Sequence, residues 1–392
     1  MADPTIELME ALNQRCRCIG LDSDLLAERL DRDEPKLFET ILADKPHMFA
    51  AFPVFIPRAH VSAMQRVVSA IEDVAALPAY RAHVLKGRPE IARVDHGPTG
   101  VFYGHDFHLG AAGPQLIEIN TNAGGAMLNV ALAEAQRACC SEVEAFENGP
   151  HDVAALEQTF VDMFRAEYRA QRGDAPLRRI AIVDLEPEKQ YLYPDFRLVQ
   201  RMLARAGIDT VLADPTALRL TGDGLVHERG PVDLVYNRLT DFYLEDHEQL
   251  REAYVRGTTV VTPNPHGYAL HADKRNLVVL SDPELLAELG VPTELREVLA
   301  AGIPRTIRVT RANADELWSR RKQLFFKPTT GFGGERPTGA PSSLAKHGTR
   351  SWRPTTLRSA KSRRASERSN SMERRYRSSW MSADLCFAGR SN

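Results

Sequence analysis

Apolar residues change their spacing along the chain, and the change predicts two kinds of structure. Over residues 5–95 they recur three and four positions apart, most clearly over 61–76, which predicts a mainly helical N-terminal region. From residue 178 onward, short apolar runs alternate with amphipathic stretches, and one strand–helix unit takes about 30 residues. This alternation predicts a parallel, Rossmann-like α/β sheet over 178–265.

The individual elements of this region can be placed from the same pattern. An amphipathic stretch over 195–206 is followed by Gly207, which predicts a helix and its end. The expected strands are 179–184, 210–214, 232–237 and 258–262. Two more helices are expected before the sheet, over 127–147 and 151–173. The region has no Gly-x-Gly-x-x-Gly turn, so a dinucleotide site is not expected.

The stretch 99–122 carries the first candidate chemistry. Its residues alternate in character, a Gly/Pro turn follows, and a second strand covers 116–120, so we expect a β-hairpin. Residues two apart on a strand share a face, so Glu118 and Asn120 point the same way. Asp106, on the partner strand, joins them if the register places it opposite.

Two carboxylates and an amide oxygen on one face form the oxygen-rich set that Mg²⁺ binds when it also holds phosphates. The Gly124-Gly125 pair after the second strand lets the backbone approach a ligand closely. The alternative is a polar, solvated face of an ordinary hairpin.

A second candidate follows the strand predicted over 324–328. Lys327 lies on this strand, which runs directly into the Gly-rich segment 329–334 with Gly331, Gly333 and Gly334. A lysine supplies charge and a glycine loop supplies backbone N–H donors, so the pair can bind phosphate. The alternative is a lysine at a strand end before an ordinary flexible loop.

Charge is distributed unevenly along the chain. The formal net charge is −2 over 392 residues, yet residues 335–392 hold eleven Arg, two Lys and only four acids. This segment also holds twelve Ser and has no apolar periodicity, so we expect it to be disordered. The alternative is a basic arm that binds nucleic acid through phosphates, although sparse aromatic residues do not support recognition of bases by stacking.

Composition narrows the class of protein further. Hydrophobic residues make up 43% and charged residues 26%, which is typical of a globular chain. No apolar run reaches about 18 residues, so no membrane partner is expected. The N-terminus is polar and acidic, and five Cys do not form a disulfide framework, so we expect reduced thiols in a cytoplasmic protein.

Taken together, the motifs resemble those of the ATP-grasp ligases. An Asp lies twelve residues before a Glu-x-Asn, and an Asp-Lys pair and a strand Lys-Pro with a Gly-rich loop come later. The metal motif precedes both lysines, which resembles the circularly permuted branch typified by glutathionylspermidine synthase. The resemblance covers roughly residues 95–334. It implies Asp106, Glu118 and Asn120 as Mg²⁺ ligands, Lys274 and Lys327 as ATP ligands, and Gly331, Gly333 and Gly334 as a phosphate lid.

The resemblance also implies an activity and a fold. The activity is ATP-dependent, ADP-forming ligation of a small carboxylate to a small amine through an acyl phosphate. Separately, Arg238 and Asp241 follow an expected strand, and ligands usually bind at the carboxyl ends of strands in such a sheet, so we predict them as catalytic residues on the substrate side. A surface salt bridge is the alternative role for these two residues. The fold is α/β (α+β), an ATP-grasp with a Rossmann-like pre-ATP-grasp sheet.

Two positions depart from the synthase pattern. Gly104 stands where the synthases carry a basic residue, two before the metal Asp. Their Glu-Tyr-Asn-Ala-Asp segment is Glu118-Ile119-Asn120-Thr121-Asn122 in this chain. The substrate is therefore not assigned as spermidine or glutathione.

The same reasoning divides the chain into five expected segments. They are a mainly helical region (1–95), the metal-binding hairpin with helices (96–177), the Rossmann-like sheet (178–265), an incomplete nucleotide-binding segment (266–334) and the Ser/Arg-rich tail (335–392). An ATP-grasp domain continues past its lid with more strands, so the composition change after residue 334 suggests a truncated or frameshifted chain. The alternative functions are then an inactive ATP-grasp fragment with a binding role, or nucleic-acid binding through the basic tail.

Overall fold

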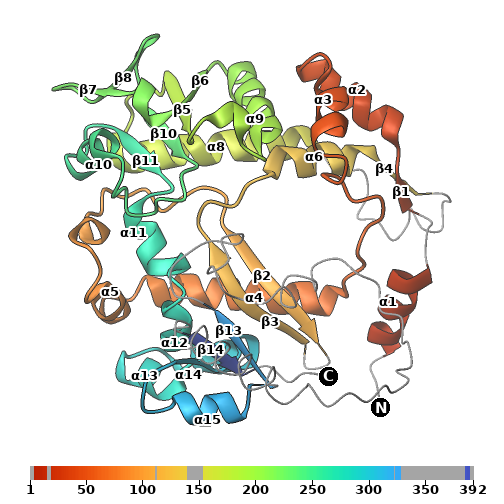
Figure 1. The fold of residues 1–392 in the computed structure, drawn as a ribbon, viewed down its shortest axis with the longest axis vertical. Coiled ribbons are helices and arrows are strands. Elements are labelled where there is room, and N and C mark those ends of the chain that lie inside the picture. The colour runs from red at the N-terminus through yellow and green to blue at the C-terminus, as the bar shows by residue number, and fades with distance from the viewer. Residues whose placement is uncertain are drawn as a thin grey trace, which may run out of the picture. The chain divides into compact units, whose positions relative to one another are not determined.

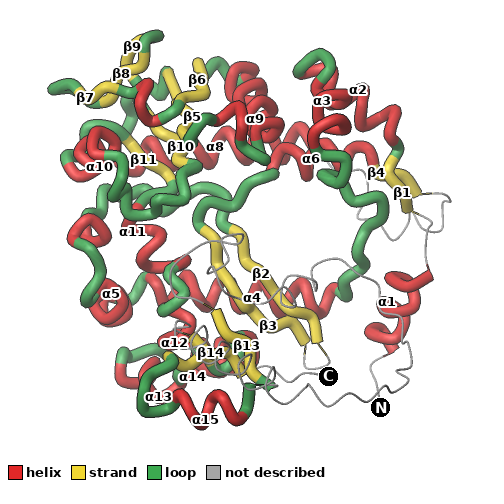
Figure 2. The backbone as a smooth tube through the Cα atoms, in the orientation of Figure 1, coloured by secondary structure: helices red, strands yellow, loops and turns green. Residues whose placement is uncertain are grey.

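The computed structural model describes residues 4–15, 19–110, 113–138, 153–321, 323–327 and 385–388. The fold mixes helices with parallel and antiparallel sheets (Figures 1 and 2). The chain divides into two compact units, Met1–Asp273 and Lys274–Asn392. The finer five-segment division stays a prediction. Among the helices of the described ranges, none has both the length and the apolar character to cross a membrane.

The first part of the chain is mainly helical, as predicted. Its elements are α1 (Pro4–Arg15), α2 (Ser23–Asp33), α3 (Leu37–Asp44), α4 (Arg58–Ala75), α5 (Pro78–Leu85) and the 3-10 turn η1 (Glu90–Arg93). The side chain of Asp22 accepts hydrogen bonds from the first backbone N–H groups of α2, which fixes where that helix begins. The helix predicted over 61–76 is α4.

The predicted hairpin is formed by β2 (Gly104–Gly110) and β3 (Gly113–Asn120), which pair antiparallel. The helix that follows is α6 (Ala126–Ala135). The expectation that this helix continues is wrong at residues 136–138, and residues 139–147 lie outside the described residues. The first of these stretches forms β4 (Gln136–Ala138), which pairs with β1 (Ile19–Leu21). Backbone groups that would continue the helix pair across the fold instead, so tertiary pairing overrides the local pattern.

Four strands form a parallel sheet, as predicted. They are β5 (Arg179–Val183), β6 (Asp209–Ala213), β10 (Leu234–Asn237) and β11 (Val260–Thr262), arranged in the order β11-β10-β5-β6. The chain starts at β5, adds β6 on one side and then β10 and β11 on the other. This is the flavodoxin-like order, and its topological switch point lies between β5 and β10.

Helices cover both faces of this sheet. Alternate strand residues Ile180, Ile182 and Tyr236 belong to the core that includes residues of α8 (Val153–Arg172) and α9 (Tyr193–Arg205). Ala181, Val183 and Val235 face the opposite core, with residues of α10 (Glu248–Val255). Fully buried parallel strands read as continuous apolar runs, which is why the sequence revealed them. Three short strands, β7 (Arg219–Leu220), β8 (Leu225–His227) and β9 (Gly230–Pro231), form a separate antiparallel sheet.

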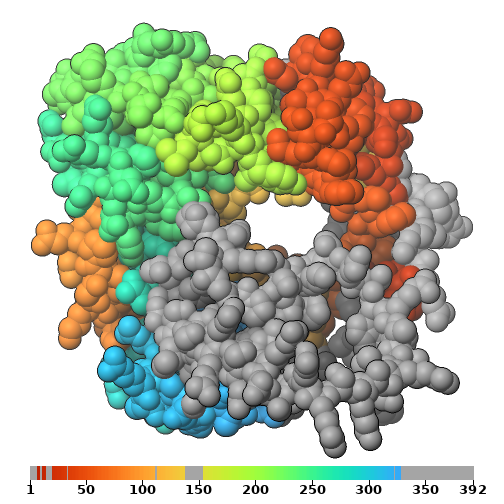
Figure 3. Space-filling view, viewed as in Figure 1, coloured from red at the N-terminus to blue at the C-terminus, as the bar shows by residue number. Residues whose placement is uncertain are grey.

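The first of these cores also joins the N-terminal helices to the sheet. Leu26 and Leu30 of α2 and Ile41 of α3 belong to the same buried cluster as Phe196 of α9. Figure 3 shows the two segments in direct contact, orange-red against yellow-green. Unit 1 closes with α11 (Pro265–Gly267) and the π-helix η4 (Tyr268–Ala272); the short turns η2 (Pro187–Lys189) and η3 (Pro215–Ala217) follow β5 and β6.

Unit 2 is a small α/β body. Its elements are α12 (Asn276–Leu280), α13 (Pro283–Glu288), α14 (Thr293–Gly302), β12 (Thr306–Arg308), α15 (Ala314–Ser319), β13 (Leu324–Lys327) and β14 (Leu385–Ala388). The strands form an antiparallel sheet in the order β12-β14-β13. The expectation of a wholly disordered tail is therefore wrong at 385–388, because these residues satisfy backbone groups of two strands. The rest of 335–392 lies outside the described residues.

Candidate functional site

The register of the hairpin brings the three predicted oxygen ligands onto one face. Asp106 lies directly opposite Glu118, and Gly104 lies opposite Asn120. The Nδ2 of Asn120 donates a hydrogen bond to the Oδ2 of Asp106 at 3.5 Å. A β-bulge follows between Asp106 and Phe107, and such bulges change the direction of neighbouring side chains near functional sites. Leu116 and Ile119 on the opposite face are buried, so the hairpin packs against the rest of the protein through that face.

The donor set suits a hard cation. Two carboxylates and one amide match the few protein ligands that Mg²⁺ takes when water and phosphate supply the others. In the part of the chain that the structure describes, no group of three or more His, Cys, Asp and Glu could hold a metal. Only two of the three predicted ligands, Asp106 and Glu118, are of these residue types. A metal bound here would need the amide oxygen of Asn120 as its third protein ligand. The role of all three as metal ligands stays a prediction.

Gly104 has a structural reason in this chain. A Cβ at this position would lie 3.0 Å from the Cβ of Ala123 and 3.7 Å from that of Asn120. The first distance is tighter than an ordinary van der Waals contact, so a longer side chain would require the loop at Ala123 to move. The basic residue that the resemblance expects at position 104 would therefore fit only if the loop at Ala123 shifted.

Two buried acids anchor the hairpin to the helices of the sheet. On α8, Glu167 accepts hydrogen bonds from the backbone N–H groups of Thr99 (3.0 Å) and Gly100 (2.8 Å), just before β2. On α9, Asp195 is only 1% exposed and accepts from the N–H groups of Gly125 (3.0 Å) and Met127 (2.9 Å), just after β3. Burial raises the pKa of Asp195, while these donors and the charge of Arg238 oppose the rise.

Arg238 follows β10 and is 6% exposed. Its Nη1 donates to the carbonyl oxygen of Ala123 at 3.0 Å, and its guanidinium carbon lies 5.3 Å from the ring centroid of Tyr236. A Cβ on Gly124 would lie 2.6 Å from the Nη2 of Arg238 and 2.3 Å from the Cδ1 of Leu192, so a side chain at position 124 would require these two side chains to move. Arg238 thus holds the loop that follows β3, and its direct contact with a substrate stays a prediction.

The carboxylate of Asp241 accepts hydrogen bonds from the protein backbone. Its two oxygens accept hydrogen bonds from the backbone N–H groups of Glu245 and Asp246, both at 2.9 Å. These bonds shape the turn between β10 and α10. The structure places Asp241 beyond the same strand end as Arg238, and its predicted role toward substrate stays a prediction.

No sequence motif singles out Asp184, yet the structure places it at the switch point. It directly follows β5, is half-buried, and its Oδ1 accepts a hydrogen bond from the N–H of Leu185 at 2.8 Å. Burial raises its pKa to about 6, although the Leu185 hydrogen bond and the charge of Arg238 oppose this, and Asp214 adds to the rise. The sequence shows that an acid follows a buried strand. It does not show the strand order, which is what places this acid at the switch point.

The two predicted nucleotide lysines lie in unit 2. Lys274 is half-buried and comes just before α12. Lys327 ends β13 and shares a strand face with Phe325, whereas Leu324 and Phe326 pack against Leu317 on the other face. Its side chain is therefore on the face away from that core. Gly331, Gly333 and Gly334 lie outside the described residues, and all five roles stay predictions.

Comparisons with known proteins give distant structural similarities. No protein-family model matches the chain, and no curated protein matches it. A glutathione synthetase-like effector from Globodera pallida, in its apo form, is similar at 13% identity and a TM-score of 0.47, over 73% of this chain and 71% of that one. A structure described as a gamma-glutamylcysteine synthetase from Methylobacillus flagellatus is similar at 11% identity and a TM-score of 0.35, over 67% of this chain and 60% of that one.

Proposed function

We propose that this chain is an ATP-dependent carboxylate–amine ligase. The observation that carries the proposal is the hairpin register, which sets Asp106 opposite Glu118 with Asn120 on the same face. Two carboxylates with an amide suit a magnesium ion that also binds phosphate oxygens. When bound by these residues, Mg²⁺ supplies positive charge to the phosphates of ATP.

The reaction needs no nucleophile from the protein. The substrate carboxylate takes the γ-phosphoryl group of ATP, which releases ADP and gives an acyl phosphate. The nitrogen of the amine then attacks the acyl carbon, the C–N bond forms, and phosphate leaves. In this proposal Lys274 and Lys327 offset phosphate charge, and Gly331, Gly333 and Gly334 exclude the water that would hydrolyse the intermediate.

The substrates belong at the carboxyl edge of the parallel sheet. Arg238 and the loop 121–125 meet there, and open α/β sheets bind ligands outside the carboxyl ends of their strands. We propose that Arg238 and Asp241 act mainly by shaping this edge. The proposal includes small-molecule partners and a cytoplasmic location.

Calorimetry with the full chain tests the metal assignment. We expect ATP to bind in the presence of Mg²⁺ and to dissociate when EDTA removes the metal. Glu118→Ala should weaken this binding by at least ~100-fold, because loss of a direct ligand costs no less than the outer-shell changes measured at metal sites. ATP binding that survives EDTA, or full affinity in Glu118→Ala, would overturn the proposal.

A matched control variant separates the loss of a metal ligand from the loss of one negative charge. Asp223 is an exposed acid in the turn between β7 and β8. Asp223→Ala removes the same charge from unit 1 and should leave the affinity for Mg-ATP unchanged.

A further inference from the structure

Asp184 differs from the other acids at the ends of the parallel strands. Asp209 accepts from Arg179 at 2.6 Å and from Arg229 at 2.7 Å, and Asp233 accepts from two backbone N–H groups at 2.8 Å. Asp214 accepts from Glu186 N–H and from both donors of Thr216. Among the described residues, Asp184 accepts only the bond from its own neighbour, Leu185.

This lack of partners is unusual for a half-buried carboxylate. Removing a carboxylate from water is costly unless hydrogen bonds or an opposite charge compensate it. In the part of the chain that the structure describes, Asp209, Asp214 and Asp233 each accept at least two hydrogen bonds, whereas Asp184 accepts one, on Oδ1. A perturbed acid of this kind in a ligand-binding location indicates a functional role.

The location of Asp184 is the one where this sheet should bind a ligand. It lies at the carboxyl end of β5, beside the end of β10, and the N–H of Arg238 donates to the carbonyl oxygen of Val183 at 2.8 Å. The split between these two strands is the topological switch point. The loop after β3 reaches the same edge through the hydrogen bond from Arg238 to the carbonyl oxygen of Ala123.

The charges around Asp184 favour a cation there. Arg238 approaches from the end of β10 and Asp214 from the end of β6. The positive charge of Arg238 also acts on Asp195, so one guanidinium serves two carboxylates. An additional positive group would therefore be stabilised at the free oxygen of Asp184.

Resting on the proposed function, we propose that Asp184 binds the amine substrate as an ammonium ion and acts as its general base. The carboxylate takes one proton from R–NH₃⁺ and leaves R–NH₂, whose lone pair attacks the acyl phosphate. The C–N bond forms as the C–O bond to phosphate breaks, and the second nitrogen proton leaves with the phosphate. Asp184 then returns its proton to water.

The raised pKa of Asp184 is consistent with this role. A base whose pKa lies near the working pH can accept a proton and release it again within one turnover. A carboxylate at its ordinary pKa of 3.8 would be a much weaker base toward an ammonium group.

Hydroxylamine separates amine activation from acyl-phosphate formation. It is uncharged at neutral pH, needs no base, and converts an acyl phosphate into a hydroxamate that gives a coloured ferric complex. The full chain is first screened with ATP, Mg²⁺, the common amino acids and dicarboxylates as acids, and hydroxylamine. Ammonium chloride and primary amines then replace hydroxylamine, and amide formation is measured.

Asp184→Asn should keep hydroxamate formation within about two-fold of the wild-type rate. Amide formation from ammonium or alkylammonium substrates should fall by ~10²–10⁴-fold, and its rise with pH between about 5 and 7 should disappear. Asp209→Asn, at the opposite edge, should change neither rate. Asp184→Glu should restore part of the amide activity.

The outcomes distinguish two failures. If wild-type protein forms no hydroxamate with any acid, the proposed function fails and this inference fails with it. If wild-type protein forms both products and Asp184→Asn also forms both, or loses both in proportion, the proposed function stands and the role of Asp184 is wrong.

Discussion

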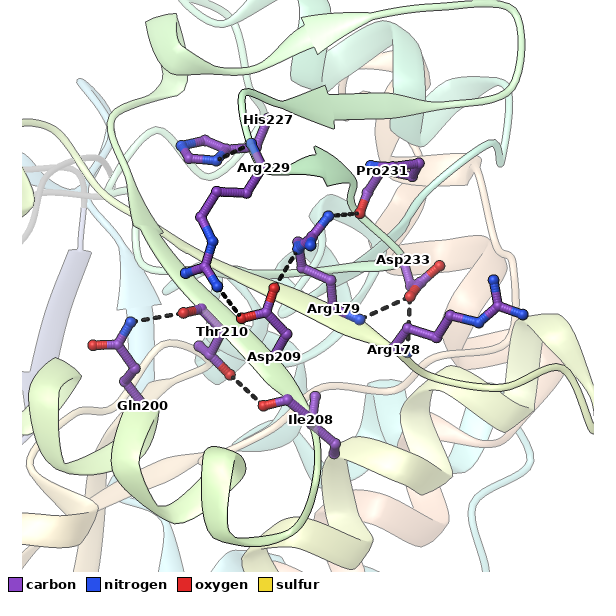
Figure 4. Close-up of polar contacts among 10 residues, drawn as sticks. All are labelled: Arg178, Arg179, Gln200, Ile208, Asp209, Thr210, His227, Arg229, Pro231 and Asp233. Atoms are coloured by element: carbon purple, nitrogen blue, oxygen red, sulfur yellow. Dashed lines mark hydrogen bonds and ion pairs between the residues drawn. The ribbon is translucent and has the colours of Figure 1, made fainter.

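The two edges of the parallel sheet treat their carboxylates in opposite ways. At the amino edge, Arg179 and Arg229 surround Asp209, and the N–H groups of Arg178 and Arg179 bind Asp233 (Figure 4). At the carboxyl edge, Asp184 has one local hydrogen bond and one arginine, Arg238, whose charge also acts on Asp195. One edge uses charge to stabilise the fold, and the other keeps a carboxylate available at some cost in stability.

Asp184 is not typical of every acid near the carboxyl edge, because Asp195 is fully hydrogen-bonded. Substitution of Asp195 should have the largest effect on stability of the acids compared here. Asp195 caps α6 through three backbone N–H groups and faces Arg238. Asp195→Ala should lower the free energy of unfolding by about 3–5 kcal/mol, because it leaves three buried backbone donors without an acceptor and removes the negative charge that acts on the buried Arg238. Urea unfolding followed by circular dichroism measures this, and a loss under about 1 kcal/mol would contradict the anchoring role.

Asp209→Asn at the amino edge should have a smaller effect of the same sign. Burial alone would raise the pKa of Asp209, but the Arg179 hydrogen bond and the charges of Arg229 and Arg179 hold it below the ordinary value. These side chains are partly exposed, so the expected loss at pH 7 is only about 1 kcal/mol.

The sign of the pH dependence provides a second check on Asp209. Its folded-state pKa is lowered, so its contribution is present above the ordinary pKa and is lost as the pH falls through the folded value. Thermal melts of wild type and Asp209→Asn should therefore converge at acidic pH. Curves that stay parallel down to acid would exclude this ion pair as a source of stability.

Asp184→Asn should have the smallest effect and the opposite sign. Its folded-state pKa is raised to about 6 from 3.8, so the unfolded chain ionises first and stability falls as pH rises between these values. The substitution should remove this slope and stabilise the fold at pH 7 by ~1 kcal/mol, after allowance for solvent screening. Destabilisation in the same assay would mean that the carboxylate is structural.

Local patterns predicted the sheet well because its strands are buried on both faces. Strands β5, β6, β10 and β11 lie within two residues of the expected bounds, and alternation placed Glu118 and Asn120 on one face. The position of Asp106 required the register, which depends on the turn and the bulge between the strands. Asp184 could not be found in this way, because strand order is a tertiary property that no window of sequence contains.

The same limit explains the two structural errors. Residues 136–138 continue a helical pattern, but they pair with β1, which lies more than a hundred positions earlier. Residues 385–388 lie in a segment without apolar periodicity and still pair with β12 and β13. In both cases the deciding partner is distant in sequence, so local propensity could not reveal it.

The paired anchors at Glu167 and Asp195 have a consequence for local unfolding. They hold the chain just before β2 and just after β3, while the hairpin between them carries the exposed Asp106. A segment bounded in this way can open as one cooperative unit without separating the helices of the sheet. Hydrogen–deuterium exchange should then show the β2–β3 amides exchanging together, and the amides of Gly100, Gly125 and Met127 exchanging only when unit 1 unfolds as a whole. It should also be possible to replace the β2–β3 hairpin by another hairpin between the two anchors without changing the rest of unit 1.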